Sequence, residues 1–167
     1  MPYTVITIRP EQWVEFRDIR LRMLADTPIA FGETLEHAQA ASEASWLARV
    51  ARATQPDRTA VAAVDEDGTW VGTMSAYLSE PGVATVAAVW VAPEHRGAEA
   101  GVTDLLMEAI TDWARDTVHA RALRLAVHEQ NTRATAYFER VGFRPTGEVQ
   151  AYELEPGGDL RVLQRDL

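Results

Sequence analysis

The chain has 167 residues, of which 47% are hydrophobic and 25% are charged, a composition typical of one soluble globular domain. Its 16 basic and 25 acidic residues give a formal charge of −9, which disfavours nucleic acids and anionic membranes as partners. Because the chain has no cysteine, disulfides, thiolate metal sites and a cysteine nucleophile are excluded.

The first third of the chain predicts a strand and two helices. Residues 4–8 form a short strand that ends before Pro10. Apolar residues at spacings of three and four then predict a helix that ends before Pro28 and buries Trp13, Phe16, Ile19, Met23 and Leu24. We expect residues 27–40 to be irregular. A second helix over residues 42–52 is expected to bury Trp46, Leu47 and Val50.

The middle of the chain predicts an antiparallel meander. Three apolar, β-branched runs occupy residues 59–65, 69–78 and 83–91. Turn dipeptides, Asp67-Gly68 and Pro81-Gly82, separate them.

The last third predicts alternating helices and strands. Apolar residues between Val102 and Ala114 mark an amphipathic helix, residues 122–127 a strand, and residues 132–141 a helix that ends at Gly142. Residues 150–154 and 160–167 form a terminal pair around Pro156-Gly157-Gly158. Since a crossover helix joins two of these strands, we expect an α/β (α+β) fold. It has a mixed, mostly antiparallel sheet with a central parallel pair and about four helices, in one domain over residues 1–167.

Other sequence signals are weak. The four histidines (His37, His95, His119 and His128) have no metal-ligand spacing, so we expect surface positions for them and no metal site. No apolar run approaches the roughly 18 residues of a membrane helix, and the N-terminus lacks a signal architecture. We therefore expect a cytoplasmic protein without a membrane partner, and a homodimer is a possible assembly.

The segment from Val89 to Leu106 has the features of an anion-binding turn. A strand leads into a helix that begins near Gly101, and the start of a helix offers free N–H groups and partial positive charge. The small residues Gly97, Ala98 and Ala100 let a phosphate approach the backbone, and Arg96 adds a cation. A tight surface turn without a ligand is the alternative.

Two motifs together resemble those of the GCN5-related N-acetyltransferase family, whose members bind acetyl-CoA. The first is matched at Val91, Pro93 and Arg96 and the second at Asn131, Ala134, Tyr137-Phe138, Gly142 and Phe143. The order of the predicted elements also matches the family, so the resemblance covers nearly the whole chain.

The first motif departs from the family pattern after Arg96. Without a gap, Glu99 takes the place of the first motif glycine; with two extra residues around Glu99 and Ala100, Gly101 takes that place and Thr103 the last small position. We favour the insertion, because the leucine-rich helix then keeps the family register. A carboxylate about 5 Å from a phosphate would also cost about 3 kcal/mol, so we expect Glu99 in solvent and a weakened cofactor site.

The resemblance implies transfer of an acetyl group from acetyl-CoA to a primary amine of a small molecule or peptide. The pyrophosphate would lie on the loop, the pantetheine arm along residues 83–91, and a backbone N–H near Trp90 and Val91 would polarise the thioester. Asn131 could instead serve only as a helix N-cap. The cofactor-binding residues expected from the resemblance are Trp90, Val91, Arg96, Gly97, Ala98, Gly101, Val102, Thr103, Asn131, Ala134 and Phe138.

The acid and base of the family are less evident. Phe138 fills the position of the usual tyrosine acid, and Tyr137 beside it points about 100° away around the helix. Thr85 fills the position of the usual glutamate base. The candidate catalytic residues are therefore Tyr137, His128 and Glu80, with Glu33 and Glu36 as further bases; packing is the alternative role for Tyr137 and an exposed loop position for His128.

Other functions remain open at this point. Phe138 and Thr85, which stand where the family has its usual acid and base, suit a non-catalytic acyl-CoA-binding module or sensor. A nucleotide-binding α/β domain would need more parallel strands than the chain supplies. For an enzyme, Phe31 and Tyr77 are expected to flank a partly apolar acceptor.

Overall fold

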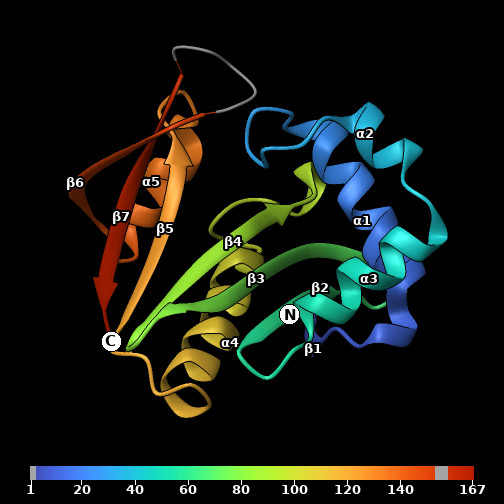
Figure 1. Cartoon of the computed structure of the whole chain (residues 1–167), viewed down its shortest axis with the longest axis horizontal. Helices are drawn as coiled ribbons and strands as arrows, with labels where there is room; N and C mark the ends of the chain where they lie inside the picture. Colours follow the sequence, from blue (N-terminus) through green and yellow to red (C-terminus); the bar gives the residue numbers. More distant parts are fainter. Residues whose placement is uncertain (1–2, 153–157) are drawn as a thin grey trace.

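One mixed sheet of seven strands, in the order β1-β2-β3-β4-β5-β7-β6, organises the fold (Figure 1). The computed structural model describes residues 3–152 and 158–167. Only β4 and β5 run parallel, and every other neighbouring pair is antiparallel. The strands are β1 (Thr4–Thr7), β2 (Arg58–Val64), β3 (Trp70–Glu80), β4 (Val83–Val91), β5 (Ala122–His128), β6 (Arg144–Ala151) and β7 (Asp159–Asp166).

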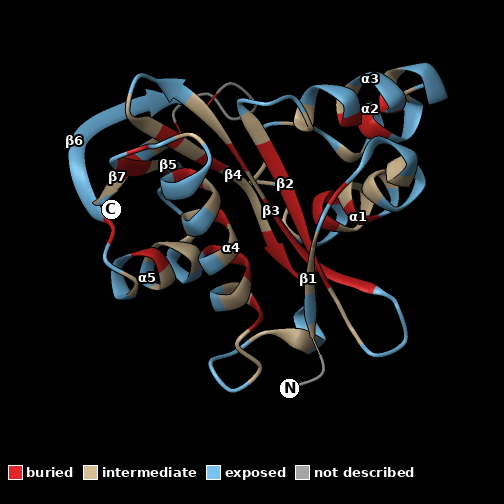
Figure 2. Ribbon diagram, turned by 90° about the horizontal axis from the view of Figure 1, so that it is seen from below, coloured by how far each residue is buried: buried red, intermediate tan, exposed pale blue. Residues whose placement is uncertain are grey.

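Helices cover both faces of this sheet (Figure 2). In the described part of the chain, α4 and α5 lie on one face and α1, α2 and α3 on the other. The alternation of strand side chains fits these two layers: Val61 and Ala63 of β2 join the core under α4, whereas Ala60 and Ala62 join the core under α1. The helices are α1 (Trp13–Asp26), α2 (Leu35–Ala40), α3 (Glu43–Ala53), α4 (Val102–Asp116) and α5 (Thr132–Arg140).

The longest helix, α4, is positioned by its apolar stripe. Val102, Leu106, Ile110 and Ala114 recur every four residues and are fully buried. Gly72 of β3 faces this stripe, and a Cβ there would lie 3.2 Å from the side chains of Leu106 and Val102. The glycine therefore lets α4 approach the sheet closely, which fixes where the helix begins.

The predicted fold class is confirmed, including the central parallel pair and the meander of β2, β3 and β4. The chain from 27 to 40 is not wholly irregular, because Thr34 caps the short helix α2 through a bond from the His37 N–H. Among the described helices there are therefore five rather than about four.

Three local predictions were wrong or lie partly outside the described residues. Leu47 is 41% exposed, because the buried stripe of α3 runs through Trp46 and Val50. Strand β6 starts at Arg144 rather than at residue 150. The predicted Pro156-Gly157-Gly158 turn lies outside the described residues except for Gly158. No helix in the described ranges is both long and apolar enough to cross a membrane.

Candidate active site

Strand β4 carries a β-bulge at its centre. Thr73 of β3 pairs with Trp90, and Ser75 pairs with Ala87, so β4 has one residue more than β3 across this interval. Ala88 absorbs the extra residue with a φ of 54°. Val86 faces α4, so unbroken alternation would turn Ala88 toward α4 as well. Instead Ala88 packs toward α1, and Val89 packs toward α4. The bulge thus shifts the alternation of side chains along β4 by one residue.

Strands β4 and β5 separate just before this bulge. Their pairing covers only Val83 to Thr85 against Ala122 to Arg124, and the strands then diverge (Figure 1). The Ala92 N–H donates to Val71 O on the β3 side at 2.8 Å. Because successive residues of a strand point their N–H groups in opposite directions, the Val91 N–H faces the gap toward β5. The gap is therefore bordered by strand backbone without a partner strand.

The loop after β4 leads into helix α4, whose N-cap residue supplies no side-chain hydrogen bond. The Gly101 N–H donates to Gly97 O at 3.2 Å, which closes a single turn around Ala98, Glu99 and Ala100. Gly97 and Gly101 have positive φ angles of 109° and 68°, and Gly101 caps α4 without a side-chain hydrogen bond. The first N–H groups of α4 are consequently available to an anion. Glu99 is exposed, in agreement with a solvated bulge.

Arg96 is held at the base of this loop. Its Nε donates to Val91 O at 2.7 Å, and its Nη2 donates to Asp26 at the end of α1. The Trp90 Nε1 donates to the same Asp26 oxygen at 2.9 Å. Partial burial opposes ionisation of Asp26, but hydrogen bonds from Thr27, Trp90 and Arg96 outweigh it and lower its pKa to about 2. Asp26 therefore joins helix α1 to the end of strand β4 and to the loop that follows it.

A cleft of about 500 Å³ runs from the bulge to α5. The loop, the end of β4 and one side of α5 line it, and its charged side chains are Arg96, Asp104, Arg133 and Arg140. Because Arg96 pairs with Asp26, Arg133 and Arg140 against Asp104 leave the cleft with one excess positive charge in an acidic protein. Sequence reasoning missed Arg133 and Arg140, although their seven-residue spacing places them on one side of a helix.

Tyr137 spans the cleft from α5 to α4. Its hydroxyl donates to Asp104 Oδ1 at 3.0 Å, and the Arg140 guanidinium carbon lies 5.1 Å from its ring centre. Burial and then the Asp104 carboxylate raise the pKa of Tyr137 well above its ordinary value. Phe138, the next residue, lines the same cleft but is only 4% exposed and packs edge-on against Phe143.

Residues 14–143 match the sequence model of the acetyltransferase (GNAT) family. The chain belongs to this family. No curated protein matches the chain in sequence. A GNAT acetyltransferase from Streptococcus pneumoniae has 14% identity and a TM-score of 0.81, with 99% of each chain covered. A GCN5-related N-acetyltransferase from Kribbella flavida has 24% identity and a TM-score of 0.70, with 99% of this chain and 98% of that chain covered.

A nourseothricin acetyltransferase is also similar, with 29% identity over 66% of each chain and a TM-score of 0.61. The expected membership of the GNAT family is thereby confirmed, and with it the prediction of an enzyme.

The predicted cofactor residues of this GNAT protein lie around the cleft, with one qualification. Nearly all of them line it, but the Val102 side chain is buried in the core, so that residue offers only its N–H. Asn131 Oδ1 accepts from the Ala134 N–H at 3.3 Å as the N-cap of α5. Since the cap uses only the carbonyl oxygen, the amide NH₂ of Asn131 can still donate to a ligand. The structure thus brings both sequence motifs to one site.

The three predicted catalytic residues are not brought together. Tyr137 lines the cleft, whereas His128 and Glu80 are absent from its described lining. His128 is 2% exposed at the end of β5, so the alternative of an exposed loop histidine was wrong. Its Nδ1 accepts from the Gln130 N–H at 3.1 Å and its ring packs on Tyr152.

Glu80 and Thr85 lie toward the other end of the meander. Glu80 pairs with Val83, five residues before Ala88 and therefore about 16 Å away along β4. Its carboxylate lies 3.6 Å from Arg124. Thr85 Oγ1 donates to Ser79 Oγ at 2.7 Å. A role for Glu80 or His128 in proton transfer remains a prediction.

A second pocket of about 410 Å³ lies between α1, α3 and the opposite face of the sheet. Ala88 lines this pocket, while the next residue, Val89, lines the cleft that runs to α5. The bulge thus contributes one residue to each cavity, on opposite faces of the sheet. Of the two further glutamates that the sequence suggested, Glu33 lines the pocket and Glu36 is exposed outside its described lining. Phe31 lines the cleft that runs to α5, and Tyr77 lies under Arg58.

Proposed function

We propose that the protein transfers the acetyl group of acetyl-CoA to a primary amine of a small molecule or peptide by direct attack. The observation that carries the proposal is that neighbouring residues of the β4 bulge, Ala88 and Val89, line two different cavities. One cavity ends at the uncapped start of α4, and the other lies on the opposite face of the sheet. A thioester at the bulge would therefore be accessible to an amine in the second pocket.

The residues present fit coenzyme A. A Cβ at Gly97 or Gly101 would point into open space, so the loop leaves room for a pyrophosphate against free N–H groups. Arg133 and Arg140 add positive charge. The gap between β4 and β5 leaves β4 backbone beyond Thr85 without a partner strand, although Val91 O accepts from Arg96, and an amide-containing pantetheine arm would pair with this backbone as an added strand.

The reaction requires a neutral amine, a polarised carbonyl and protonation of the leaving sulfur. The amine nitrogen forms a bond to the thioester carbon, the C–S bond breaks, and the amine loses one proton while the thiolate gains one. We assign the carbonyl contact to the Val91 N–H and its neighbours on the open edge of β4, where a fixed dipole stabilises the developing oxyanion. No covalent intermediate on the protein is needed.

Tyr137 is the side chain best placed to protonate the sulfur. It lines the cleft, and its raised pKa keeps its hydroxyl protonated near neutral pH. Glu33 is a poor base, because Arg49 and His37 hydrogen bonds outweigh its partial burial and lower its pKa. We therefore assign removal of the amine proton to water in the acceptor pocket.

Calorimetry with acetyl-CoA, combined with thiol release in the presence of a panel of amines, tests the proposal. We expect acetyl-CoA to bind and at least one amine to release free thiol. Binding without turnover on any amine would instead favour a non-catalytic acyl-CoA-binding module, which the phenylalanine at position 138 would also suit.

A further inference from the structure

The acceptor pocket is strongly cationic. Its described charged lining consists of Glu33 and four arginines: Arg20, Arg49, Arg52 and Arg58. The formal balance of this lining is +3, from four positive charges and one negative charge, in a chain with a formal charge of −9. Such a concentration of positive charge attracts an anion and repels a polyamine. The remaining wall is partly apolar and includes Phe16 and Trp46.

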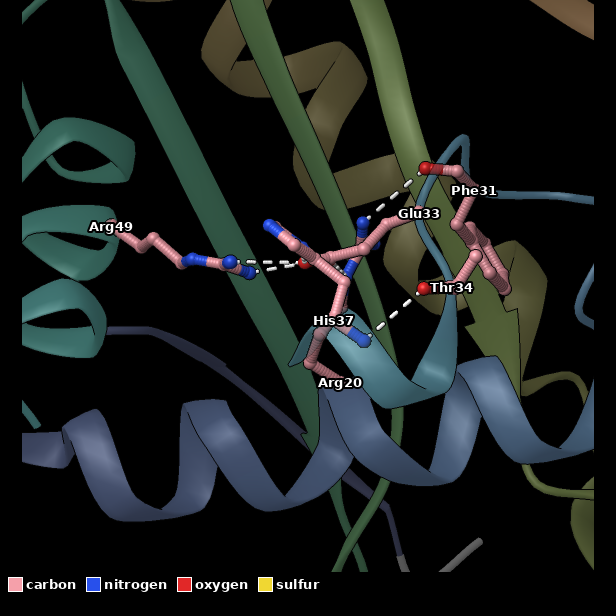
Figure 3. Close-up of polar contacts among 6 residues, drawn as sticks. All are labelled: Arg20, Phe31, Glu33, Thr34, His37 and Arg49. Atoms are coloured by element: carbon pink, nitrogen blue, oxygen red, sulfur yellow. Dashed lines mark hydrogen bonds and ion pairs between the residues drawn. The ribbon is translucent and has the colours of Figure 1, made fainter. Parts of the chain in front are cut away.

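Glu33 is fully engaged within this lining (Figure 3). Its Oε1 accepts from Arg20 Nε at 3.1 Å and its Oε2 lies 2.9 Å from Arg49 Nη2, while the His37 Nδ1 lies 2.8 Å from the same Oε2. The Glu33 side chain is 11% exposed. Arg20 also donates to Phe31 O at 3.3 Å. One carboxylate thus holds two guanidinium groups from α1 and α3 in fixed positions and neutralises only one of them.

The other two arginines have no carboxylate. In residues 3–152 and 158–167, neither Arg52 nor Arg58 forms an ion pair. The Nε of Arg58 is buried and has no hydrogen-bond partner in that part of the chain. A buried donor without an acceptor is costly, so an acceptor oxygen from a ligand would stabilise this group. Arg58 is positioned by Tyr77, whose ring centre lies 5.0 Å from the guanidinium carbon.

The distance from Arg58 to the bulge limits the size of the ligand. Arg58 lies on β2 and Ala88 on β4, two strand spacings or about 10 Å apart across the sheet. Arg58 pairs with Tyr77 and Tyr77 with Thr85, so Arg58 is level with Thr85, which lies about 10 Å from Ala88 along β4. The Arg58 side chain covers part of this distance, because it reaches over Tyr77 of β3, the intervening strand. A small molecule with its amine at the bulge and an anionic group directed toward Arg58 can span what remains of this distance.

We propose that the acceptor is a small primary amine that also carries an anionic group, as an amino acid or an aminophosphonate does, and that Arg58 and Arg52 bind that group. This inference rests on the function proposed above. It assigns specificity to the arginine-lined pocket, since a carboxylate or phosphonate would complete the hydrogen bonding of Arg58 and offset the excess positive charge.

The test compares matched amines on the full-length protein: amino acids, their carboxamides, aminophosphonates and neutral alkylamines of similar size, and a polyamine. We expect kcat/KM for an acid to exceed that for its carboxamide at least tenfold. The R58Q and R52Q variants should lose most of this preference, because kcat/KM should fall much more for the acid than for its carboxamide. The R115Q variant, which removes an equal charge from the 54% exposed Arg115 of α4, should keep the preference.

The outcomes separate this inference from the proposed function. Turnover of neutral amines or of the polyamine with no preference for acids would overturn the inference and leave the acetyltransferase function intact. Failure of every amine to release thiol would count against the function itself. Calorimetric titration of an amino acid and its carboxamide makes the same comparison without turnover, and equal affinities there would also overturn the inference. A preference for aminophosphonates over amino acids would support it and identify the anion.

Discussion

The Tyr137 hydroxyl on α5 donates to Asp104 Oδ1 on the first turn of α4 at 3.0 Å. This hydrogen bond joins the two helices that border the cofactor cleft, across 33 positions of the chain. It also orients the only tyrosine among the described residues of the cleft lining. The bond therefore connects the architecture of the cleft with the proton transfer that we propose for Tyr137.

Replacement of Tyr137 by phenylalanine should lower kcat about 10- to 100-fold, because a positioned acid contributes about this much or more. The Kd for acetyl-CoA should change little. Steady-state kinetics with a saturating amine measures the effect. Because the pKa of Tyr137 is raised, deprotonation of this residue should not reduce kcat below about pH 10.

Tyr152→Phe is the matched control, since it removes a buried hydroxyl that lies outside the described cleft lining. This control should keep kcat within about twofold of the wild type. An unchanged kcat in Tyr137→Phe would show that water protonates the sulfur.

Replacement of Asp26 by asparagine should destabilise the protein by about 1–3 kcal/mol at pH 7, since charge-assisted bonds from Trp90 and Arg96 are weakened. The pKa of Asp26 falls from 3.8 to about 2 on folding. Its ionised form therefore contributes about 2 kcal/mol to the free energy of unfolding. This contribution is complete above about pH 4 and is lost as the pH falls through 2.

Urea unfolding between pH 7 and pH 2 measures this difference. Asp18→Asn, on an exposed position of the same helix, is the control. A gap between wild type and Asp26→Asn that stays constant as the pH falls would contradict the assignment.

Replacement of Gly101 by alanine should weaken acetyl-CoA binding about tenfold or more, because the added methyl group enters the open space where the phosphate is expected. The left-handed backbone at Gly101 adds a folding cost of about 1–2 kcal/mol. Calorimetry and thermal unfolding separate the two effects. Gly68→Ala, in the turn between β2 and β3, has the same strain and equally open space. The Gly68→Ala variant should lose stability and keep its affinity for acetyl-CoA.

Glu99 and Asp104, the acidic residues near the loop, should have unequal effects on the affinity for acetyl-CoA. Glu99 is exposed outside the described cleft lining, so Glu99→Gln should change the Kd for acetyl-CoA by less than about twofold. Asp104 lines the cleft, and Asp104→Asn should tighten binding about fivefold, from the loss of about 1 kcal/mol of repulsion. Calorimetry at low and high salt compares the Kd for acetyl-CoA of the two variants. A larger gain for Glu99→Gln would place Glu99 against the phosphate and remove the case for a solvated bulge.

The sequence predicted the elements whose periodicity is strong. The stripe of α4 was predicted correctly because one face of the helix is buried, and the parallel pair of β4 and β5 because a crossover helix joins the two strands. Strand β6 started six residues earlier than predicted because every residue from Arg144 to Ala151 is exposed. An edge strand of this kind has no apolar alternation to recognise.

The candidate site was harder to predict because it depends on tertiary geometry. The bulge at Ala88 lies in a run of small apolar residues without a glycine, and only the register with β3 reveals it. The burial of His128 follows from its position between β7 and Tyr152, which no local pattern indicates. The arginines of the acceptor pocket come from α1, α3 and β2, so their convergence is invisible in the sequence.

Transfer of an isotopically labelled acetyl group tests the central claim most directly. The protein is incubated with labelled acetyl-CoA and an amine, and the products and the intact protein are examined by mass spectrometry. Direct attack predicts one labelled amide for each free thiol released, with no label on the protein. Label retained on the protein, or thiol released without a labelled amide, would contradict the account.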